Sequence, residues 1–159
     1  MRVGFGYDSH RFAPGRRLVL GGVEITHERG LDGWSDADVI AHAVIDALCG
    51  AASLGDIGRL FPPGDPRYRD ASSMRLLASV AGMVAAAGFD IVNVDVTVIA
   101  EQPLLKTHIP RMQQELGAAM GIDAALATVK AKTNEGMGFV GRGEGIAACS
   151  VVLIETRKD

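Results

Sequence analysis

Apolar and polar residues alternate along several short stretches of the chain, which is the period of a β-strand with one buried face. These stretches are rich in valine, isoleucine and aromatic residues, and we predict strands at residues 3–10, 90–100, 128–132 and 146–156. Leu18-Val19-Leu20 and Val23-Glu24-Ile25 flank Gly21-Gly22, which predicts a β-hairpin.

Helical segments are indicated by their start and stop signals. Ser35, three residues before Asp38, predicts a capping-box-like start to a helix that runs through about residue 52. A second helix is predicted from about residue 72 to 87, ended by Gly88, and a third from Pro110 to about residue 120. Glycine and proline at 55–58 and 61–66 predict a long, mobile loop of the kind that is often functional.

The order of these elements predicts the fold class. Strands and helices alternate, but a hairpin stands at the start and an antiparallel pair of strands is expected at the end. This order favours an α+β fold, with a mixed sheet and helices packed on one face, over a doubly wound parallel sheet. Without repeats or an internal linker, residues 1–159 are expected to form a single domain.

Composition narrows the function classes. Apolar residues make up 48% of the chain and the net charge is -3 without a basic run, so nucleic acid is not an expected partner. Cys49 and Cys149 stand alone in apolar stretches, as buried thiols in a reducing compartment do. No signal-sequence pattern opens the chain, and no apolar run reaches the roughly 18 residues of a membrane span. We therefore expect a cytoplasmic protein without a membrane partner.

A candidate metal site involves Asp8, His10 and His42. Side chains two apart on a strand share a face, so Asp8 and His10 can converge on one point, and His42 lies on the predicted helix that follows. One carboxylate and two imidazoles suit zinc or a similar divalent ion. Three protein ligands leave a position for water or substrate.

The helix that carries His42 has an unusual polar stripe. Asp38, His42 and Asp46 are spaced four and four on a segment that is otherwise apolar all round and should be buried. One interpretation is a core histidine that an aspartate holds in place. The combination with Asp8 and His10 favours a metal ligand, which Asp38 or Asp46 would orient through its other ring nitrogen.

The run from residue 130 to 145 is rich in glycine, which exposes backbone amides and lets a ligand approach closely. Lys132, Thr133 and Arg142 supply donors for phosphate, and Glu135 could hold a hard cation such as Mg²⁺ against it. The alternative is a long hairpin with solvated charges. Because a predicted metal site accompanies the run, a phosphate-bearing substrate is favoured.

Several of these motifs together resemble one enzyme family over nearly the whole length. They are Gly6-Tyr7-Asp8-Ser9-His10, residues 35–39 with His42-Ala43, residues 55–58 with Phe61-Pro62, His108-Ile109-Pro110, and residues 133–145. In this order they resemble the 2-C-methyl-D-erythritol 2,4-cyclodiphosphate synthases of the non-mevalonate isoprenoid pathway.

The resemblance implies a homotrimer with its active sites at the subunit interfaces. The implied substrate is 4-CDP-2-C-methyl-D-erythritol 2-phosphate, whose 2-phosphate attacks the β-phosphorus so that CMP leaves, a phosphorus–oxygen lyase reaction. Asp8, His10 and His42 would hold the zinc-type ion, and Glu135 a second ion, Mg²⁺ or Mn²⁺, at the diphosphate. An isoprenoid diphosphate on the trimer axis, near Arg142, is a further implied partner, and Glu144 would pair with Arg142.

Site residues follow from the same resemblance. Thr133 would stabilise the transition state, and Ser35 would help to place the diphosphate. The methylerythritol part would be gripped by Asp56, Ile57, Gly58, Phe61, Pro62, Pro63, Gly64 and Asp65. The cytidine pocket would be lined by Ala100, Glu101, Gln102, Pro103, Leu104, Leu105, Lys106 and Lys132. The remaining positions implied near substrate are Ser9, Asn134, Phe139 and Arg142.

Three positions depart from the family pattern. Trp34 stands where the family has a histidine with a transition-state role, and an indole offers one N–H donor but neither an acceptor nor a charge. Pro63 replaces an aspartate. Leu104 replaces a lysine, although Lys106 follows two residues later.

Two other functions are compatible with the residues. A metal-dependent phosphohydrolase could use the same site to activate water. A non-catalytic module that binds a nucleotide or an isoprenoid diphosphate would result if Trp34 abolished turnover.

Overall fold

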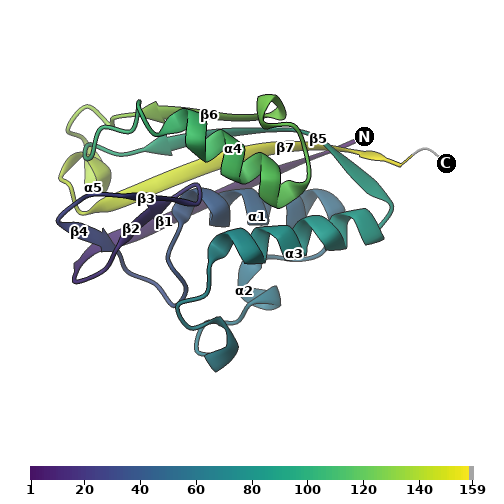
Figure 1. The fold of residues 1–159 in the computed structure, drawn as a ribbon, viewed down its shortest axis with the longest axis horizontal. Coiled ribbons are helices and arrows are strands. Elements are labelled where there is room, and N and C mark those ends of the chain that lie inside the picture. The colour runs from purple at the N-terminus through teal and green to yellow at the C-terminus, as the bar shows by residue number, and fades with distance from the viewer. Residues whose placement is uncertain (158–159) are drawn as a thin grey trace.

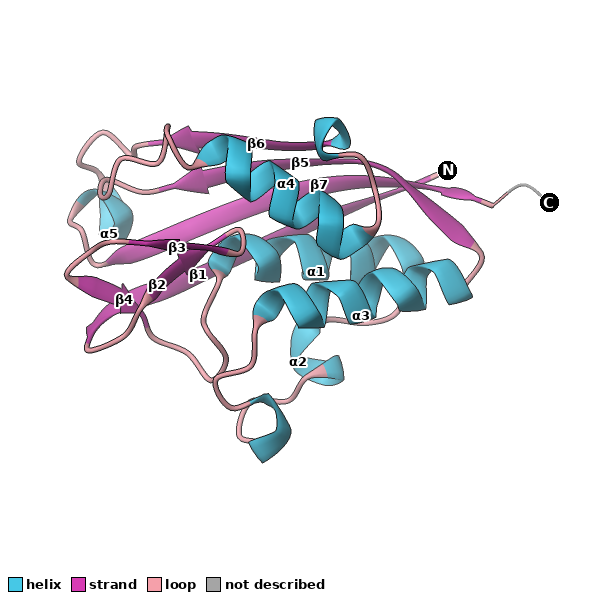
Figure 2. Ribbon diagram, viewed as in Figure 1, coloured by secondary structure: helices cyan, strands magenta, loops and turns pink. Residues whose placement is uncertain are grey.

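The four predicted long strands form one five-stranded mixed sheet together with a short strand, β4, that the sequence did not predict, in a computed structural model that describes residues 1–157 (Figures 1 and 2). Residues 158 and 159, which the predicted domain includes, lie outside the described residues. The order across the sheet is β4 (Arg29–Leu31), β1 (Arg2–Pro14), β7 (Gly145–Thr156), β5 (Phe89–Ile99) and β6 (Ala127–Lys132). The prediction of an α+β fold with a mixed sheet is confirmed.

The last two strands do not pair as the sequence suggested. β6 lies at the edge of the sheet, parallel to β5, whereas β7 runs antiparallel between β1 and β5. The prediction of an antiparallel pair at the end of the chain is therefore wrong. The reason is that β7 is 12 residues long and apolar from Ile146 to Ile154 except at Ser150, so it fills the centre of the sheet, where both its edges are paired.

The predicted hairpin is confirmed, with β2 (Leu18–Leu20) paired to β3 (Val23–Ile25) in a small sheet of its own. Its turn residues Gly21 and Gly22 have positive φ angles of 56° and 76°, the conformation that favours glycine.

Three helices cover one face of the large sheet: α1 (Val39–Ala52), α3 (Ser73–Ala86) and α4 (Ile109–Met120) (Figure 1). The helix α1 packs against β1 at the two positions where the strand has glycine. A Cβ on Gly4 would lie 1.9 Å from the carbonyl oxygen of Ala47, and one on Gly6 would lie 2.0 Å from that of Ala43. These glycines let the helix approach the strand that carries Asp8 closely.

The start of α1 differs from the prediction. Asp38, not Ser35, is the N-cap, and its fully buried carboxylate accepts hydrogen bonds from the amides of Ile40 and Ala41 at 3.1 Å. The same carboxylate accepts from the amides of Gly21 and Gly22 at 2.8 and 2.7 Å, so it joins the helix to the hairpin. An aspartate with these four donors is the stronger cap.

The ends of α3 and α4 agree with the prediction. Gly88, with a φ of 83°, follows α3, and Gly121, with a φ of 70°, ends α4. The predicted long loop is less irregular than its composition suggested, because it contains two short helical turns, α2 (Ile57–Leu60) and η1 (Pro66–Tyr68). Asp56 and Asp65 cap them by accepting from the amides of Arg59 and Arg67.

Two more short turns complete the described chain, η2 (Ala124–Leu126) and, inside the glycine-rich run, α5 (Gly138–Gly141). No helix in residues 1–157 is both long and apolar enough to cross a bilayer.

The face of the sheet opposite the helices carries an exposed apolar patch over β1 and β7. The outward-facing residues of β1, Val3, Phe5 and Tyr7, are 67%, 64% and 49% exposed, and Val151 of β7 is 45% exposed. Phe5 lies directly opposite Val151 on the neighbouring strand, so these side chains form one patch, the open sheet face.

Candidate metal centre

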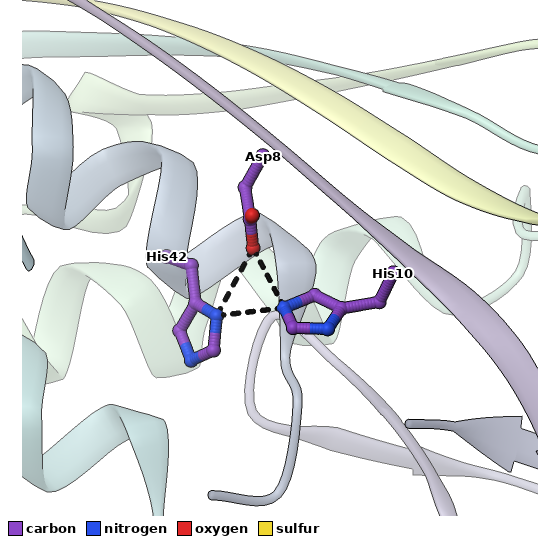
Figure 3. A group of neighbouring side chains, drawn as sticks. All are labelled: Asp8, His10 and His42. Carbon is purple, nitrogen blue, oxygen red and sulfur yellow. Dashed lines mark hydrogen bonds and ion pairs between the residues drawn. The ribbon is translucent and has the colours of Figure 1, made fainter. Parts of the chain in front are cut away.

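Asp8 and His10 of β1 and His42 of α1 point at one another (Figure 3). The Oδ2 atom of Asp8 lies 2.9 Å from Nε2 of His10 and 3.0 Å from Nδ1 of His42, and those two ring nitrogens are 3.1 Å apart. The strand period and the close approach of α1 at Gly6 bring these three atoms together. The predicted convergence of the three side chains is confirmed.

The donor set fits a divalent ion. In a tetrahedral zinc site with bonds of about 2.0–2.1 Å, ligand atoms lie about 3.3 Å apart, close to the three separations found here. One carboxylate oxygen and two imidazole nitrogens are also a typical zinc set, with a position left over for water or substrate.

Hydrogen bonds fix the tautomer of each imidazole. The Nδ1–H of His10 donates to the carbonyl oxygen of Asp32 at 2.6 Å, which leaves the lone pair of Nε2 toward the cluster. The Nε2–H of His42 donates to the hydroxyl of Ser73 at 2.9 Å, and that hydroxyl donates to the carboxylate of Asp36. Both histidines therefore present a free lone pair to the same point, as metal ligands must.

The side chains that orient His42 are not the ones the sequence suggested. Asp46 accepts a hydrogen bond from the amide of Ile57 at 2.8 Å, and Asp38 caps α1. Among the described residues, no hydrogen bond joins either carboxylate to the imidazole of His42. Both carboxylates are instead engaged by backbone amides, so the shared stripe does not lead to a hydrogen bond with the imidazole.

Sequence reasoning missed Ser73 as the partner of His42 and Asp36 as the partner of Ser73. Ser73 is fully buried and lies 31 residues away in the chain, at the first turn of α3. The backbone amide of Ser73 also donates to Asp36 at 3.0 Å, so Asp36 holds this residue at two atoms. The one sequence feature that could have indicated this contact is Asp36 itself, an aspartate between Ser35 and Asp38 to which the sequence analysis assigned no role.

The electrostatics favour an ionised carboxylate at the centre. Burial disfavours the charge of Asp8, but the hydrogen bonds and charges of His10 and His42 outweigh burial and lower its pKa below the ordinary range. Burial likewise disfavours protonated His10, yet its hydrogen bond with Asp8, the charge of Asp8 and the carbonyl of Asp32 raise its pKa above 6.5. A metal ion and a proton would therefore compete for Nε2 of His10.

A cavity of about 220 Å³, the helix-side cavity, adjoins the cluster on the side of α1 and α2. It brings the three ligands together with residues of the predicted methylerythritol loop. Besides the ligands its lining includes Trp34, Ser35, Ile57, Gly58, Phe61 and Pro63. Asp56 and Asp65 instead cap α2 and η1, and Pro62 and Gly64 are exposed in the same loop.

A second cavity, of about 610 Å³, reaches His10 from the other side and is called the strand-side cavity. It is lined by Ser9, His10, Arg11, Phe12, Phe139 and Glu144. Phe139 thus lines the same cavity as His10. The expected ion pair is confirmed, because Nε of Arg142 donates to Oε1 of Glu144 at 2.6 Å.

The residues predicted for cytidine and for the second ion gather at a separate place, where β5 and β6 end. Oε1 of Glu101 accepts hydrogen bonds from the amides of Asn134 and Gly136 at 2.8 and 3.2 Å. Between them Glu135 has a φ of 52° and accepts a hydrogen bond from the hydroxyl of Thr133 at 2.8 Å. The glycine-rich run is therefore an ordered loop that presents Thr133 and Glu135 together.

Other members of the predicted cytidine group are placed differently. The amide of Ala100 donates to the carbonyl oxygen of Lys132 at 2.9 Å, which joins the two segments. Leu104 is 78% exposed, whereas Leu105 is 4% exposed and belongs to the core. Gln102, Pro103 and Lys106 lie in the loop that follows β5.

The two groups of site residues are far apart within one chain. β1 and β6 are separated by two intervening strands, and neighbouring strands lie about 4.8 Å apart, so the groups are about 14 Å apart across the sheet. Both lie at the same end of the sheet, because His10 pairs with Ile146 and Ile99 pairs with both Ala147 and Lys132.

The fold and this centre define a mixed α+β domain in which an Asp/His/His cluster that could hold a metal ion lies beside two cavities. The model of the YgbB family matches residues 1–155, and the chain belongs to this family. A 2-C-methyl-D-erythritol 2,4-cyclodiphosphate synthase of Dehalococcoides mccartyi is 55% identical over 157 residues, which cover 99% of this chain and 100% of the relative. The resemblance inferred from the motifs is confirmed.

Solved structures agree with this assignment. The bifunctional IspDF from Campylobacter jejuni superposes with a TM-score of 0.94 at 41% identity, covering 98% of this chain and 42% of that longer protein. IspF of Plasmodium falciparum, in a CDP complex, has a TM-score of 0.86 at 30% identity and covers 99% and 97% of the two chains.

Proposed function

We propose that the chain converts 4-CDP-2-C-methyl-D-erythritol 2-phosphate to 2-C-methyl-D-erythritol 2,4-cyclodiphosphate and CMP, in the non-mevalonate isoprenoid pathway. The observation that carries the proposal is the Asp8, His10 and His42 cluster, present in a chain that full-length relatives of this name match at 55% identity. A phosphorus–oxygen lyase that releases CMP is the corresponding reaction class.

The chemistry suits the side chains of this chain. An oxygen of the 2-phosphate forms a bond to the β-phosphorus, and the bond from that phosphorus to the oxygen shared with the α-phosphate breaks, so that CMP leaves with the oxygen. The attacking phosphate is anionic at neutral pH and needs no general base. Positioning and charge neutralisation are then the main requirements.

Divalent ions would supply the charge neutralisation when bound. Asp8, His10 and His42 would hold a zinc-type ion, and Glu135 would hold Mg²⁺ or Mn²⁺ at the diphosphate. The hydroxyl of Thr133, beside Glu135, would donate to a phosphate oxygen. Ser35 would help to place the diphosphate from its position in the lining of the helix-side cavity.

The ends of the substrate would lie in different parts of the fold. The methylerythritol part would occupy the helix-side cavity against Ile57, Gly58 and Phe61. The cytidine would bind the loops at the ends of β5 and β6, where Glu101 organises the backbone amides of residues 134–136.

A complete site would require more than one copy of the chain, and we propose a homotrimer with active sites at its interfaces. Two observations support it. The two groups of site residues lie about 14 Å apart across one sheet, and the open sheet face exposes Phe5 and Tyr7 to solvent in a single chain. An isoprenoid diphosphate near Arg142, on the trimer axis, is the proposed additional ligand.

Product analysis tests the reaction. Purified protein with Zn²⁺ and Mg²⁺ is expected to give the cyclic diphosphate and CMP in equal amounts. Linear monophosphates would instead indicate a phosphohydrolase. No turnover in the parent, with turnover restored in a Trp34→His variant, would favour the non-catalytic binding module.

The metal site has its own test. His42→Ala is expected to lose bound zinc, because it removes one of the three ligands, and to retain the fold, because alanine is compatible with the buried helix α1. Zinc content is measured by elemental analysis and the fold by circular dichroism. Full zinc occupancy in the variant would refute the assignment.

The oligomer is tested by its mass. Light scattering is expected to give about 50 kDa, three times the chain mass of 16.7 kDa. Phe5→Glu places a charge on the open sheet face and should give monomers, whereas Arg75→Glu, on α3, should leave the trimer intact. A monomeric parent protein would refute the proposal.

A further inference from the structure

Trp34 connects two walls of the helix-side cavity. Its indole Nε1–H donates a hydrogen bond to the carbonyl oxygen of Asp65 at 2.8 Å. Trp34 lies on the segment that follows β4, whereas Asp65 closes the loop that carries Phe61 and Pro63. Trp34, Phe61 and Pro63 all line the cavity, so this hydrogen bond joins the segment after β4 to the loop that forms the opposite side of the cavity.

The segment that carries Trp34 is also attached to the same loop region by backbone hydrogen bonds. The amide of Asp70 donates to the carbonyl oxygen of Trp34 at 2.8 Å, and the amide of Asp36 donates to that of Ala71 at 3.0 Å. These bonds hold residues 70 and 71 beside residues 34–36. Residues 70 and 71 follow η1, however, so these backbone bonds do not attach residues 61–65 to the segment that carries Trp34.

The loop itself is arranged to receive the indole. The carbonyl of Asp65 also accepts from the amide of Tyr68 at 3.0 Å, so it is the first acceptor of η1. Phe61 packs edge-on against Tyr68 with their ring centroids 5.3 Å apart. Fixing the Asp65 carbonyl therefore also fixes the turn against which Phe61 packs.

We propose that Trp34 is a positioning residue, a latch that holds residues 61–65 over the helix-side cavity and thereby sets the depth of the part of the site that receives the small polyol phosphate. This cavity has a volume of about 220 Å³ in the single chain. The polyol part of this inference rests on the proposed function, whereas the latch does not.

The indole N–H, rather than the bulk of the ring, is the group to test. Trp34→Phe removes the donor and retains an aromatic ring. Arg69→Ala is the matched control, because the guanidinium of Arg69 lies 5.9 Å from the centre of the Trp34 ring and its loss leaves the hydrogen bond in place. Both variants are made in the full chain with zinc present.

Hydrogen–deuterium exchange of residues 61–69 is the first measurement. Trp34→Phe is expected to speed exchange there about fivefold, the effect of losing one hydrogen bond of average strength, with no change in β1, β5 or β7. Arg69→Ala should exchange at the parent rate. Unchanged exchange in Trp34→Phe, or an equal increase in Arg69→Ala, would overturn the latch.

Steady-state kinetics is the second measurement. Trp34→Phe is expected to raise KM about fivefold and to change kcat less than twofold, because a latch acts on bound substrate and transition state alike. A fall in kcat at constant KM would overturn the positioning role and indicate contact with the reacting groups. If the parent enzyme has no turnover, the proposed function fails, but the exchange measurement still decides on the latch.

Discussion

We predict that loss of the hydrogen bond from His42 to Ser73 weakens the binding of zinc. In the Ser73→Ala variant, the Nε2–H of His42 loses its acceptor at 2.9 Å, and Asp36 loses the hydroxyl that it accepts from. The hydroxyl of Ser35, 3.2 Å from the same nitrogen, remains as a weaker partner. The imidazole should therefore keep its tautomer but lose part of its fixed orientation.

The expected magnitude follows from these contacts. Losing a partner that orients a metal-bound histidine typically costs 10–100-fold in metal affinity. Because Ser35 can take over part of the role, we expect a loss of about tenfold for Ser73→Ala. The free energy of unfolding should also fall by about 1–3 kcal/mol, because the variant leaves buried polar groups with fewer partners.

The assay is a zinc titration against a competing chelator. Ser72→Ala is the control, because the Ser72 side chain makes no capping hydrogen bond at the start of α3. Asp36→Asn should weaken zinc binding as well, since an amide cannot accept at both oxygens as Asp36 does from Ser73. Zinc affinity of Ser73→Ala within twofold of the Ser72→Ala value would refute the reasoning.

Three further predictions concern packing, capping and pH. Gly6→Ala should destabilise the fold by about 3 kcal/mol or more, because its Cβ would lie 2.0 Å from a carbonyl oxygen of α1, whereas Gly50→Ala, with no atom within 4 Å, should not destabilise. Thermal unfolding measures both variants. Asp38→Ala should cost about 2–4 kcal/mol, because four backbone amides lose their acceptor, yet the zinc affinity of the folded variant should stay near the parent value. Zinc affinity should fall about tenfold per pH unit below the pKa of His10, which is raised above 6.5, because protons then compete with the metal.

Each of these three has an outcome that would contradict it. A Gly6→Ala protein as stable as Gly50→Ala would mean that α1 does not press on β1. A large loss of zinc affinity in folded Asp38→Ala would restore this aspartate to the metal site. Zinc affinity that is constant between pH 6 and 8 would mean that no proton leaves the cluster on binding.

Local patterns in the sequence were sufficient for most elements of the fold. The alternation in residues 3–10 and the glycine pair at 21–22 specify a strand and a hairpin turn, because both depend on backbone preferences of a few neighbouring residues. The predicted start of α1 was wrong, because Asp38 is the N-cap and its carboxylate is also held by two backbone amides of the hairpin. A distant contact of this kind leaves no trace in the local pattern.

The order of the strands in the sheet could not be predicted from the sequence either. β6 and β7 are consecutive strands in the chain, yet β7 lies between β1 and β5. This order is favoured because the long apolar strand β7 is then paired on both edges and buried. That order places the loop of Thr133 and Glu135 far from His42 within one chain. It is the observation that supports a shared site between copies.

For the candidate metal centre, the sequence alone was sufficient to predict the convergence of the three side chains, because the strand period aligns Asp8 with His10 and the helix carries one imidazole among apolar neighbours. Only the tertiary structure decided what orients those ligands. Ser73, Asp36 and the Asp32 carbonyl are brought to the imidazoles by the packing of α3 and the loop after β4. The same packing set the indole of Trp34 on Asp65. Ligand identity follows from side-chain chemistry at short spacing, whereas ligand orientation depends on hydrogen bonds between segments that meet only when the chain is folded.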